Sequence, residues 1–135
     1  MTPQKVAEQF VTAINAHDVE RLASLMTSDH RFIDSLGAAI EGRDAMHEGW
    51  KFYFDMVPDY HLDIRSFFIA EDGKAEAMLV GVASGSYWSN GIKRPDSSWS
   101  APAALRTLVR GGQIAEWQVY ADNKPIREQM RAASV

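Results

Sequence analysis

The sequence predicts an α+β domain in which helices cover one face of a curved antiparallel sheet. Through the first 60 residues, apolar side chains recur at helical spacing, and from about residue 60 onward they alternate with a period of two. Turn signals at Asp72-Gly73, Asn90-Gly91 and Gly111-Gly112 then divide the second half into strands of an antiparallel meander.

Three helices are predicted in the N-terminal half. Thr2 and Pro3 open the first, and Asp18 is a favourable N-cap for the second, which the pattern extends to about Ser28. The third begins near Gly42 and ends before Pro58. Their predicted inner faces comprise Val6, Phe10 and Ile14, then Leu22, Leu25 and Met26, then Met46, Trp50 and Phe54.

A short apolar strand ending at Asp34 separates the second and third helices, and four longer strands follow them. The predicted long strands cover residues 61–70, 74–88, 98–110 and 113–121. Asp122 or Asn123 then caps a short final helix, with Pro125 in its first turn and Ile126 and Met130 pointing inward.

Composition limits the class of protein. The chain has 135 residues, of which 46% are hydrophobic and 24% charged, so we expect one globular domain over residues 1–135. The net charge of -4 and the scattered Lys and Arg residues predict no nucleic-acid partner and no binding to an anionic membrane. The absence of a secretory signal at the N-terminus and of a long apolar run predicts a cytoplasmic protein with no membrane span.

Cysteine and histidine usage limits the chemistry. There is no cysteine, which excludes disulfides, thiolate nucleophiles and Cys-ligated metals. The four histidines show no HExxH or comparable spacing, so neither a metal nor a cofactor is predicted.

Two interpretations of Asp34 remain open from the residues alone. Asp34 and Gly37 stand at the first and fourth positions of a natural type I turn, in which the Asp side chain bonds nearby backbone N-H groups. Alternatively, Asp34 shares one face of its strand with Phe32 and points with it into the interior, where it can act as a base.

Four segments carry a resemblance to a known family: IDSLG, EGRDAMHEGW, PDYHLDI and GGQIAEWQVYADN. With the order of elements, they resemble the SnoaL-like and ketosteroid isomerase-like branch of the NTF2-like superfamily. The resemblance implies an NTF2-like cone, a curved antiparallel sheet wrapped around three N-terminal helices plus a short C-terminal helix. The superfamily includes isomerases, polyketide cyclases, dehydratases, epoxide hydrolases and binding modules, so the fold alone does not decide the function.

The resemblance places Asp34 at the position of the general base in the steroid isomerases. Their oxyanion tyrosine and aspartic acid fall at Phe10 and at Leu105 or Ala104, which are apolar. Met26 and Trp50 stand at the positions of their supporting tyrosines. Val119 and Trp117 stand at the positions where the polyketide cyclases have an acidic residue and a histidine. Loss of the donors argues against steroid isomerisation by that mechanism, because an enolate needs donors where its charge develops.

The resulting hypothesis is a small-molecule enzyme, an isomerase or lyase, in which Asp34 moves a proton inside an aromatic pocket. His30 and Tyr53 are the further catalytic candidates, the first as acid or partner and the second as a donor. Aromatic walls suit an apolar or aromatic ligand. The predicted lining comprises Phe10, Met26, Phe32, Trp50, Phe54, Leu105 and Trp117, with Trp88 and Trp99 flanking a loop over the pocket mouth.

Two further expectations concern partners. The alternative to an enzyme is a non-catalytic module that binds a hydrophobic or aromatic metabolite, with Asp34 serving only as a turn residue. An outer sheet face of mixed polarity around Arg106, Ser98, Ser100 and Leu108 predicts a homodimer.

Overall fold

The computed structural model describes residues 2–133. In this part of the chain the helices are α1 (Pro3–Asn15), α2 (Val19–Ser24), α3 (Arg43–Met56) and α4 (Lys124–Ala133). The strands are β1 (Met26–Ile33), β2 (Ala39–Glu41), β3 (His61–Ile69), β4 (Glu76–Gly85), β5 (Trp88–Ser89), β6 (Ile92–Lys93), β7 (Trp99–Arg110) and β8 (Gln113–Ala121). None of these helices is both long and apolar enough to cross a membrane.

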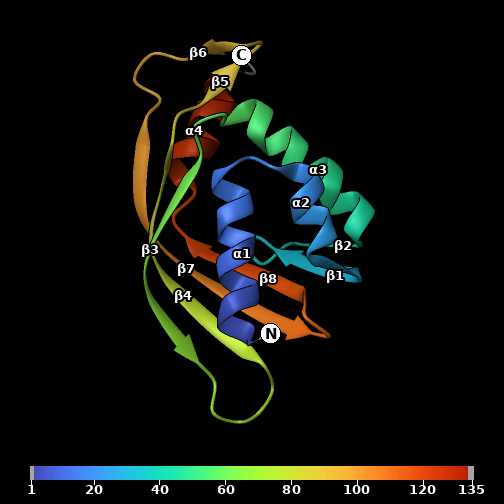
Figure 1. The fold of residues 1–135 in the computed structure, drawn as a ribbon. Helices are drawn as coiled ribbons and strands as arrows, with labels where there is room; N and C mark the ends of the chain where they lie inside the picture. The colour runs from blue at the N-terminus through green and yellow to red at the C-terminus, as the bar shows by residue number, and fades with distance from the viewer. Residues whose placement is uncertain (1, 134–135) are drawn as a thin grey trace.

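Six strands form one curved sheet in the order β2-β1-β8-β7-β4-β3, and β5 and β6 form a separate small hairpin (Figure 1). Neighbouring strands run antiparallel, except that β1 pairs in parallel with β8. The predicted α+β fold is therefore confirmed, and the parallel pair makes the sheet a mixed one.

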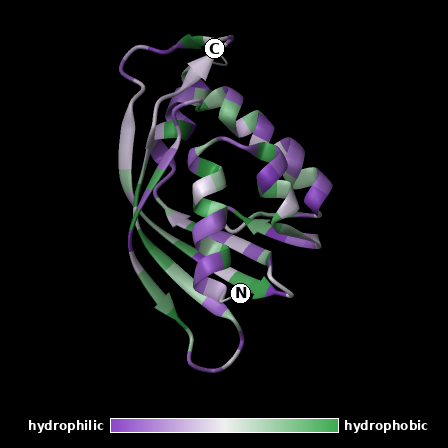
Figure 2. Ribbon diagram, in the orientation of Figure 1, coloured by the Kyte–Doolittle hydropathy of each residue, from purple (hydrophilic) through white to green (hydrophobic). Residues whose placement is uncertain are grey.

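Helix α1 begins and lies as the sequence predicts. The Oγ1 atom of Thr2 accepts a hydrogen bond from the backbone N-H of Lys5 at 3.2 Å, which caps the helix. The helix packs on the sheet and contacts β3, β4, β7 and β8 (Figure 1). Hydrophilic and hydrophobic residues alternate along the helices, as an amphipathic helix on a sheet requires (Figure 2).

Helix α2 is shorter than the sequence predicts, and the prediction for Met26 is wrong. The helix ends at Ser24, and Met26 is the first residue of β1, where it pairs with Ile114 of β8. The carbonyl of Leu25 accepts a hydrogen bond from the N-H of Ile114 at 2.7 Å. The backbone groups at this point therefore form hydrogen bonds to β8, although the spacing of the apolar residues alone predicts that the helix continues.

The interior between α1 and the sheet is filled by large apolar side chains. Phe10 and Trp117 are fully buried, with ring centroids 4.7 Å apart, and Leu105 is buried beside them in the same core cluster. Dense packing of this kind leaves little room for a ligand at the centre of the cone. Space for a ligand remains at the end of the fold where α3, α4 and the β1–β2 hairpin meet.

Candidate functional site

Asp34 occupies the turn that joins β1 to β2. Its Oδ1 atom accepts hydrogen bonds from the backbone N-H groups of Leu36 and Ala38, at 2.9 and 3.0 Å. Its own N-H donates to the carbonyl of Ala38, and its carbonyl accepts from the N-H of Gly37. The turn interpretation is therefore confirmed, with Gly37 supplying the positive φ of +85° that the turn requires.

The same aspartate also lines a cavity of about 330 Å³. Most of the lining comes from α3, α4 and the β1–β2 hairpin, with one residue each from β8, from the segment before β3 and from the segment before α4. The lining residues are Phe32, Asp34, Ser35, Ile40, Met46, Gly49, Trp50, Phe52, Tyr53, Tyr60, Val119, Asn123, Ile126, Arg127 and Met130. Asp34 is half-buried, and its Oδ2 atom has no hydrogen-bond or ion-pair partner among residues 2–133.

Four aromatic rings follow one another along the cavity wall. Phe32 meets Trp50 edge-to-face at a centroid distance of 6.1 Å, and Trp50 meets Tyr53 in the same way at 6.3 Å. Tyr53 meets Tyr60 edge-to-face at 5.1 Å. This geometry fixes the rings by favourable quadrupole contacts and gives a rigid wall suited to a flat apolar ligand.

The structure brings four of the predicted site residues to this cavity, namely Phe32, Asp34, Trp50 and Tyr53. The other predicted lining residues lie elsewhere. Phe10, Met26, Phe54, Leu105 and Trp117 belong to the packed core, where they have 0 to 7% of their surface exposed and do not line the cavity.

Trp88 and Trp99 also lie outside the cavity lining. The Nε1 atom of Trp88 donates to Ser86 Oγ at 2.9 Å, and the ring of Trp99 contacts that of Tyr60 at 6.1 Å. The loop between these tryptophans touches α4, where Gln129 Nε2 donates to the carbonyl of Asp96 at 3.5 Å. Trp99 therefore supports the cavity wall from behind through Tyr60.

Tyr60 and Arg127 are two polar cavity residues among those that the sequence did not predict for the site. Burial raises the pKa of the Tyr60 hydroxyl and of the Tyr53 hydroxyl well above the ordinary tyrosine value, so both stay protonated. Neither hydroxyl bonds to another described residue, and neither is among the fully enclosed polar atoms. Both phenols therefore keep an O–H donor that no described residue uses.

His30 lies in the core, fully buried, and does not line the cavity. Its Nδ1 atom is 2.8 Å from the carbonyl oxygen of Ile114, and because a carbonyl only accepts, Nδ1 carries the proton. The Nε2 atom has no partner among the described residues. Loss of solvation lowers the pKa of His30, although the Ile114 carbonyl and the charges of Asp29 and Glu116 act in the opposite direction.

We expect this histidine to make the protein sensitive to acid. The unfolded chain binds a proton at His30 near pH 6.5, and the folded chain does so only at lower pH, so the free energy of unfolding falls as the pH is lowered below 6.5. The slope from this group approaches about 1.4 kcal/mol per pH unit. Urea unfolding at a series of pH values between 5 and 7.5 measures this change of the unfolding free energy with pH.

A pair of variants isolates the effect. His30→Gln removes the titrating group and flattens the slope, whereas His61→Gln, at an exposed position, leaves the slope as in the unmodified protein. Equal slopes for the unmodified protein and His30→Gln would show that His30 is not the acid-sensitive group.

No group of three His, Asp or Glu side chains within residues 2–133 is arranged to hold a metal ion. His47 instead pairs with carboxylates on the helix surface, with Nε2 2.6 Å from Glu20 Oε1 of α2. The hydrogen bond to Glu20 raises the pKa of His47 and links α3 to α2.

Comparison with known proteins agrees with this architecture. A family model described as a SnoaL-like domain matches residues 7–117. No curated protein is detectably similar in sequence to this chain.

Solved structures share the fold at low sequence identity. A protein of ketosteroid isomerase-like fold from Catenulispora acidiphila, in complex with trimethylamine, is 22% identical, with a TM-score of 0.77 over 96% of this chain and 93% of that one. A candidate polyketide cyclase from Pseudomonas putida is 20% identical, with a TM-score of 0.80 over 96% of this chain and 98% of that one. An NTF2-like protein of unknown function from Cytophaga hutchinsonii is 16% identical, with a TM-score of 0.67 over 94% and 96% of the two chains.

Proposed function

The chain belongs to the SnoaL-like domain family, and from this membership and the cavity we propose that it is a small-molecule enzyme of the isomerase or lyase type. Asp34 is the base that takes a proton from a carbon atom of a flat, largely apolar ligand. The observation that supports this most is the position of Asp34 in the lining of an aromatic cavity, with one carboxylate oxygen fixed and the other without a partner.

The hydrogen bonds of the turn give the base its orientation. Two backbone N-H groups hold Oδ1, so the hairpin fixes the position of this oxygen independently of the ligand. In the proposed step, Oδ2 takes a proton from the carbon next to a ligand carbonyl, and the electron pair of that C–H bond moves into an enolate. A positioned base of this kind is worth about 10² to 10⁴ in rate.

Tyr53 and Tyr60 supply the donors that such an enolate requires. They replace the donors that the resemblance to the steroid isomerases places at Phe10 and at Leu105 or Ala104, all of which are apolar and outside the cavity lining. Because both phenols stay protonated, each can donate an O–H hydrogen bond to the oxygen on which negative charge develops.

A substrate need not be known to test this proposal. The protein is incubated in D₂O with a panel of flat cyclic and aryl ketones, and the loss of their α-proton signals is followed by NMR. Exchange that is faster than in buffer and saturates with ketone concentration supports the proposal. A panel that binds without any catalysed exchange would favour the alternative below.

The alternative is a non-catalytic binding module. Two observations favour it: the hydrogen bonds of Asp34 account for a turn residue without chemistry, and a solved relative of this fold holds a small molecule, trimethylamine. Thermal stabilisation by apolar ligands that is the same in Asp34→Asn would be the signature of this class.

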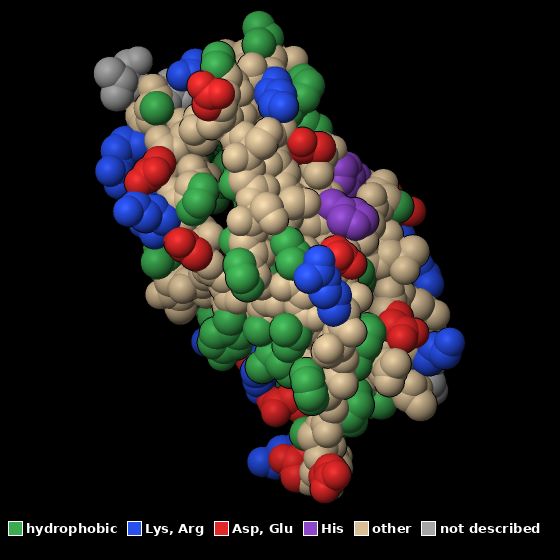
Figure 3. All heavy atoms as spheres, turned by 90° about the vertical axis from the view of Figure 1, so that its left-hand side faces the viewer, with side chains coloured by type: hydrophobic (Ala, Val, Ile, Leu, Met, Phe, Trp, Pro, Cys, Tyr) green, Lys and Arg blue, Asp and Glu red, His purple; other side chains and the backbone are tan. Residues whose placement is uncertain are grey.

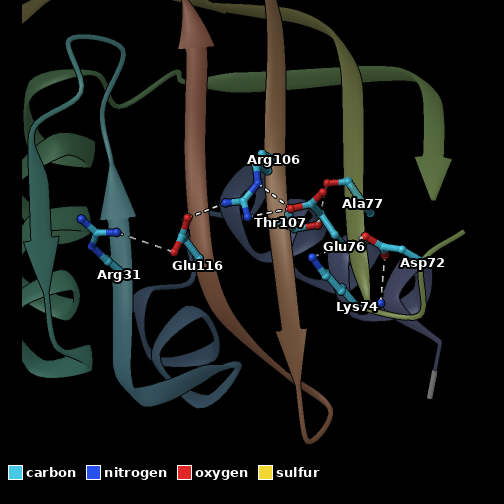
Figure 4. Close-up of polar contacts among 8 residues, drawn as sticks. All are labelled: Arg31, Asp72, Lys74, Glu76, Ala77, Arg106, Thr107 and Glu116. Atoms are coloured by element: carbon cyan, nitrogen blue, oxygen red, sulfur yellow. Dashed lines mark hydrogen bonds and ion pairs between the residues drawn. The ribbon is translucent and has the colours of Figure 1, made fainter. Parts of the chain in front are cut away.

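We also propose that the protein is a homodimer built on the outer face of the sheet. Four charged side chains form a row of alternating sign across β1, β8, β7 and β4 (Figure 4). The row runs Arg31, Glu116, Arg106, Glu76, with 3.9 Å between Arg31 and Glu116 and 2.6 Å between Arg106 and Glu76. Read from its other end, the row has the opposite sign at every position, so a two-fold axis through its centre pairs each charge with its complement.

Apolar side chains lie beside this row. Phe68, Val80 and Tyr120 are among the large hydrophobic residues that remain exposed, and their pairing registers place them on the outer face. Viewed from the side of β3, β4 and β7, hydrophobic side chains gather among scattered charged ones (Figure 3). Such a mixture of apolar area and complementary charge is typical of an interface between two copies.

Sedimentation velocity measures the expected assembly. The unmodified protein should sediment at twice the chain mass at micromolar concentration, and Val80→Glu should sediment as a monomer because it buries an unpaired charge in the interface. The control, Ile92→Glu, places the same charge on the exposed β5–β6 hairpin and should leave the dimer intact. A monomeric unmodified protein would contradict the proposal.

A further inference from the structure

Arg127 presents unused hydrogen-bond donors to the cavity. It is half-buried in the first turns of α4, and its Nε atom donates to the side-chain Oδ1 of Asn123 at 2.6 Å. The two terminal nitrogens of the guanidinium, with four N-H groups, have no partner among residues 2–133. Asn123 therefore fixes the direction of the guanidinium and leaves its terminal donors available.

Arg127 lines the cavity without a carboxylate partner, whereas Arg21, Arg43 and Arg94, which also form no ion pair within the described residues, lie outside this lining. Arg31, Arg65, Arg106 and Arg110 each form an ion pair with an Asp or Glu side chain. Arg127 forms no such pair within the described residues, although it is less exposed than Arg65 and Arg110. A guanidinium that is partly desolvated and unpaired is poised to bind an anion, because its planar N-H pair matches a carboxylate.

The cation and the proposed base come from different parts of the lining, Arg127 from α4 and Asp34 from the β1–β2 turn. Asp34 and Arg127 are the two charged side chains in the lining, and no ion pair joins them. At about 30 Å³ per water-sized volume, a cavity of about 330 Å³ has room for on the order of ten non-hydrogen atoms. A single ring that carries an acidic group therefore matches the cavity in size.

We propose that the ligands of this cavity carry a carboxylate and that Arg127 binds it, so that the substrate class is a cyclic or aromatic acid. The inference rests on the proposed function, since it names the substrate class of the same cavity. The carboxylate lies at the α4 end, and the aromatic wall of Trp50 and Tyr53 holds the ring. The carbon that loses its proton then lies toward Asp34, and the like charges of the two carboxylates are kept at opposite ends of the cavity.

Two probes of equal size and shape test the role of charge. Phenylacetate and phenylacetamide are titrated separately into the protein at low ionic strength, with NMR detection of the Arg127 Nε–Hε resonance. We expect phenylacetate to bind about tenfold more tightly than the amide and to shift that resonance. Asp34→Asn should bind phenylacetate as tightly or more tightly, because it removes a like charge from the cavity.

Three variants test whether Arg127 causes the preference for phenylacetate over phenylacetamide. Arg127→Gln should abolish it, and Arg127→Lys should retain part of it, because lysine keeps the charge and loses the planar fork. Lys124→Gln removes the same charge from the same helix at an exposed position outside the cavity lining and should leave the preference unchanged. Circular dichroism and thermal unfolding of Arg127→Gln establish that α4 is still folded.

These experiments distinguish a failure of the Arg127 proposal from a failure of the proposed function. Equal binding of the acid and the amide by the unmodified protein, or a preference that survives in Arg127→Gln, overturns the role of Arg127 and leaves the proton-transfer proposal standing. Absence of binding for both probes overturns the ligand class and counts against the cavity as a binding site. Catalysed α-proton exchange, measured separately on ketones, decides the proposed function itself.

Discussion

Asp34→Asn should lower the rate of α-proton exchange by about 10² to 10⁴ while the hairpin stays intact. Asparagine keeps a side-chain carbonyl oxygen where Oδ1 accepts the N-H groups of Leu36 and Ala38, so the turn is preserved. It cannot take up a proton as a carboxylate does. The variant therefore separates the turn role that the hydrogen bonds show from the proposed role as a base.

Asp34→Ala is the matched control for the turn. It removes both hydrogen bonds and should cost about 1 to 2 kcal/mol of unfolding free energy, because the turn is partly open to water. Denaturant unfolding should thus rank Asp34→Asn close to the unmodified protein and Asp34→Ala below it. An Asp34→Asn protein that is folded and exchanges α-protons at the original rate would exclude Asp34 as the base.

Tyr53→Phe and Tyr60→Phe should each lower the exchange rate, by up to about 10² to 10³, with little change in substrate affinity. Each substitution removes one donor from the position where negative charge develops and keeps the aromatic ring in the wall. The two effects are expected to be non-additive if both phenols bind one oxygen, since either can partly serve for the other.

Tyr120→Phe is the control for these variants, because Tyr120 lies outside the cavity lining and the substitution keeps its ring on the outer face of the sheet. It should exchange protons at the original rate. Burial raises the pKa of Tyr53 and Tyr60, so the pH–rate profile should show no alkaline decline from these groups up to pH 10. If the exchange rate declined below pH 10 and the decline disappeared in Tyr53→Phe, Tyr53 would be a tyrosine that ionises readily. This result would contradict its role as a hydrogen-bond donor.

The fold was predictable because its local signals agree with its long-range pairing. Thr2 and Pro3 open α1, and Pro58 follows the end of α3 as expected. The second helix was predicted too long because Leu25 and Met26 continue the helical spacing, while their backbone groups bind Ile114, far along the chain. The parallel pairing of β1 with β8 has no local signal and was missed for the same reason.

The candidate site was predictable in part. Phe32 and Trp50 reach the cavity because each lies on the inward side of an element whose periodicity is clear, and Asp34 follows Phe32 in the turn directly after β1. The deep pocket expected around Phe10 and Trp117 is absent from the described structure, because side-chain volume decides how the interior fills and the sequence pattern does not report volume.

Two cavity residues could not have been found from the pattern alone. Tyr60 precedes β3 and carries no periodic signal, although it lies in the PDYHLDI segment that supports the family resemblance. Arg127 adjoins the inward-facing Ile126 on α4. Its relation to the cavity depends on how the last helix docks, which is a tertiary property.

The central claim is that Asp34 is a base in a binding cavity, and one paired measurement on Asp34→Asn tests it most directly. Ligand affinity and α-proton exchange are measured by NMR on the same sample, with the ketone that the unmodified protein exchanges fastest. We predict an affinity within about twofold of the unmodified protein and an exchange rate lower by about 10² or more. Unchanged exchange at unchanged affinity would contradict it and leave Asp34 as a residue of the turn.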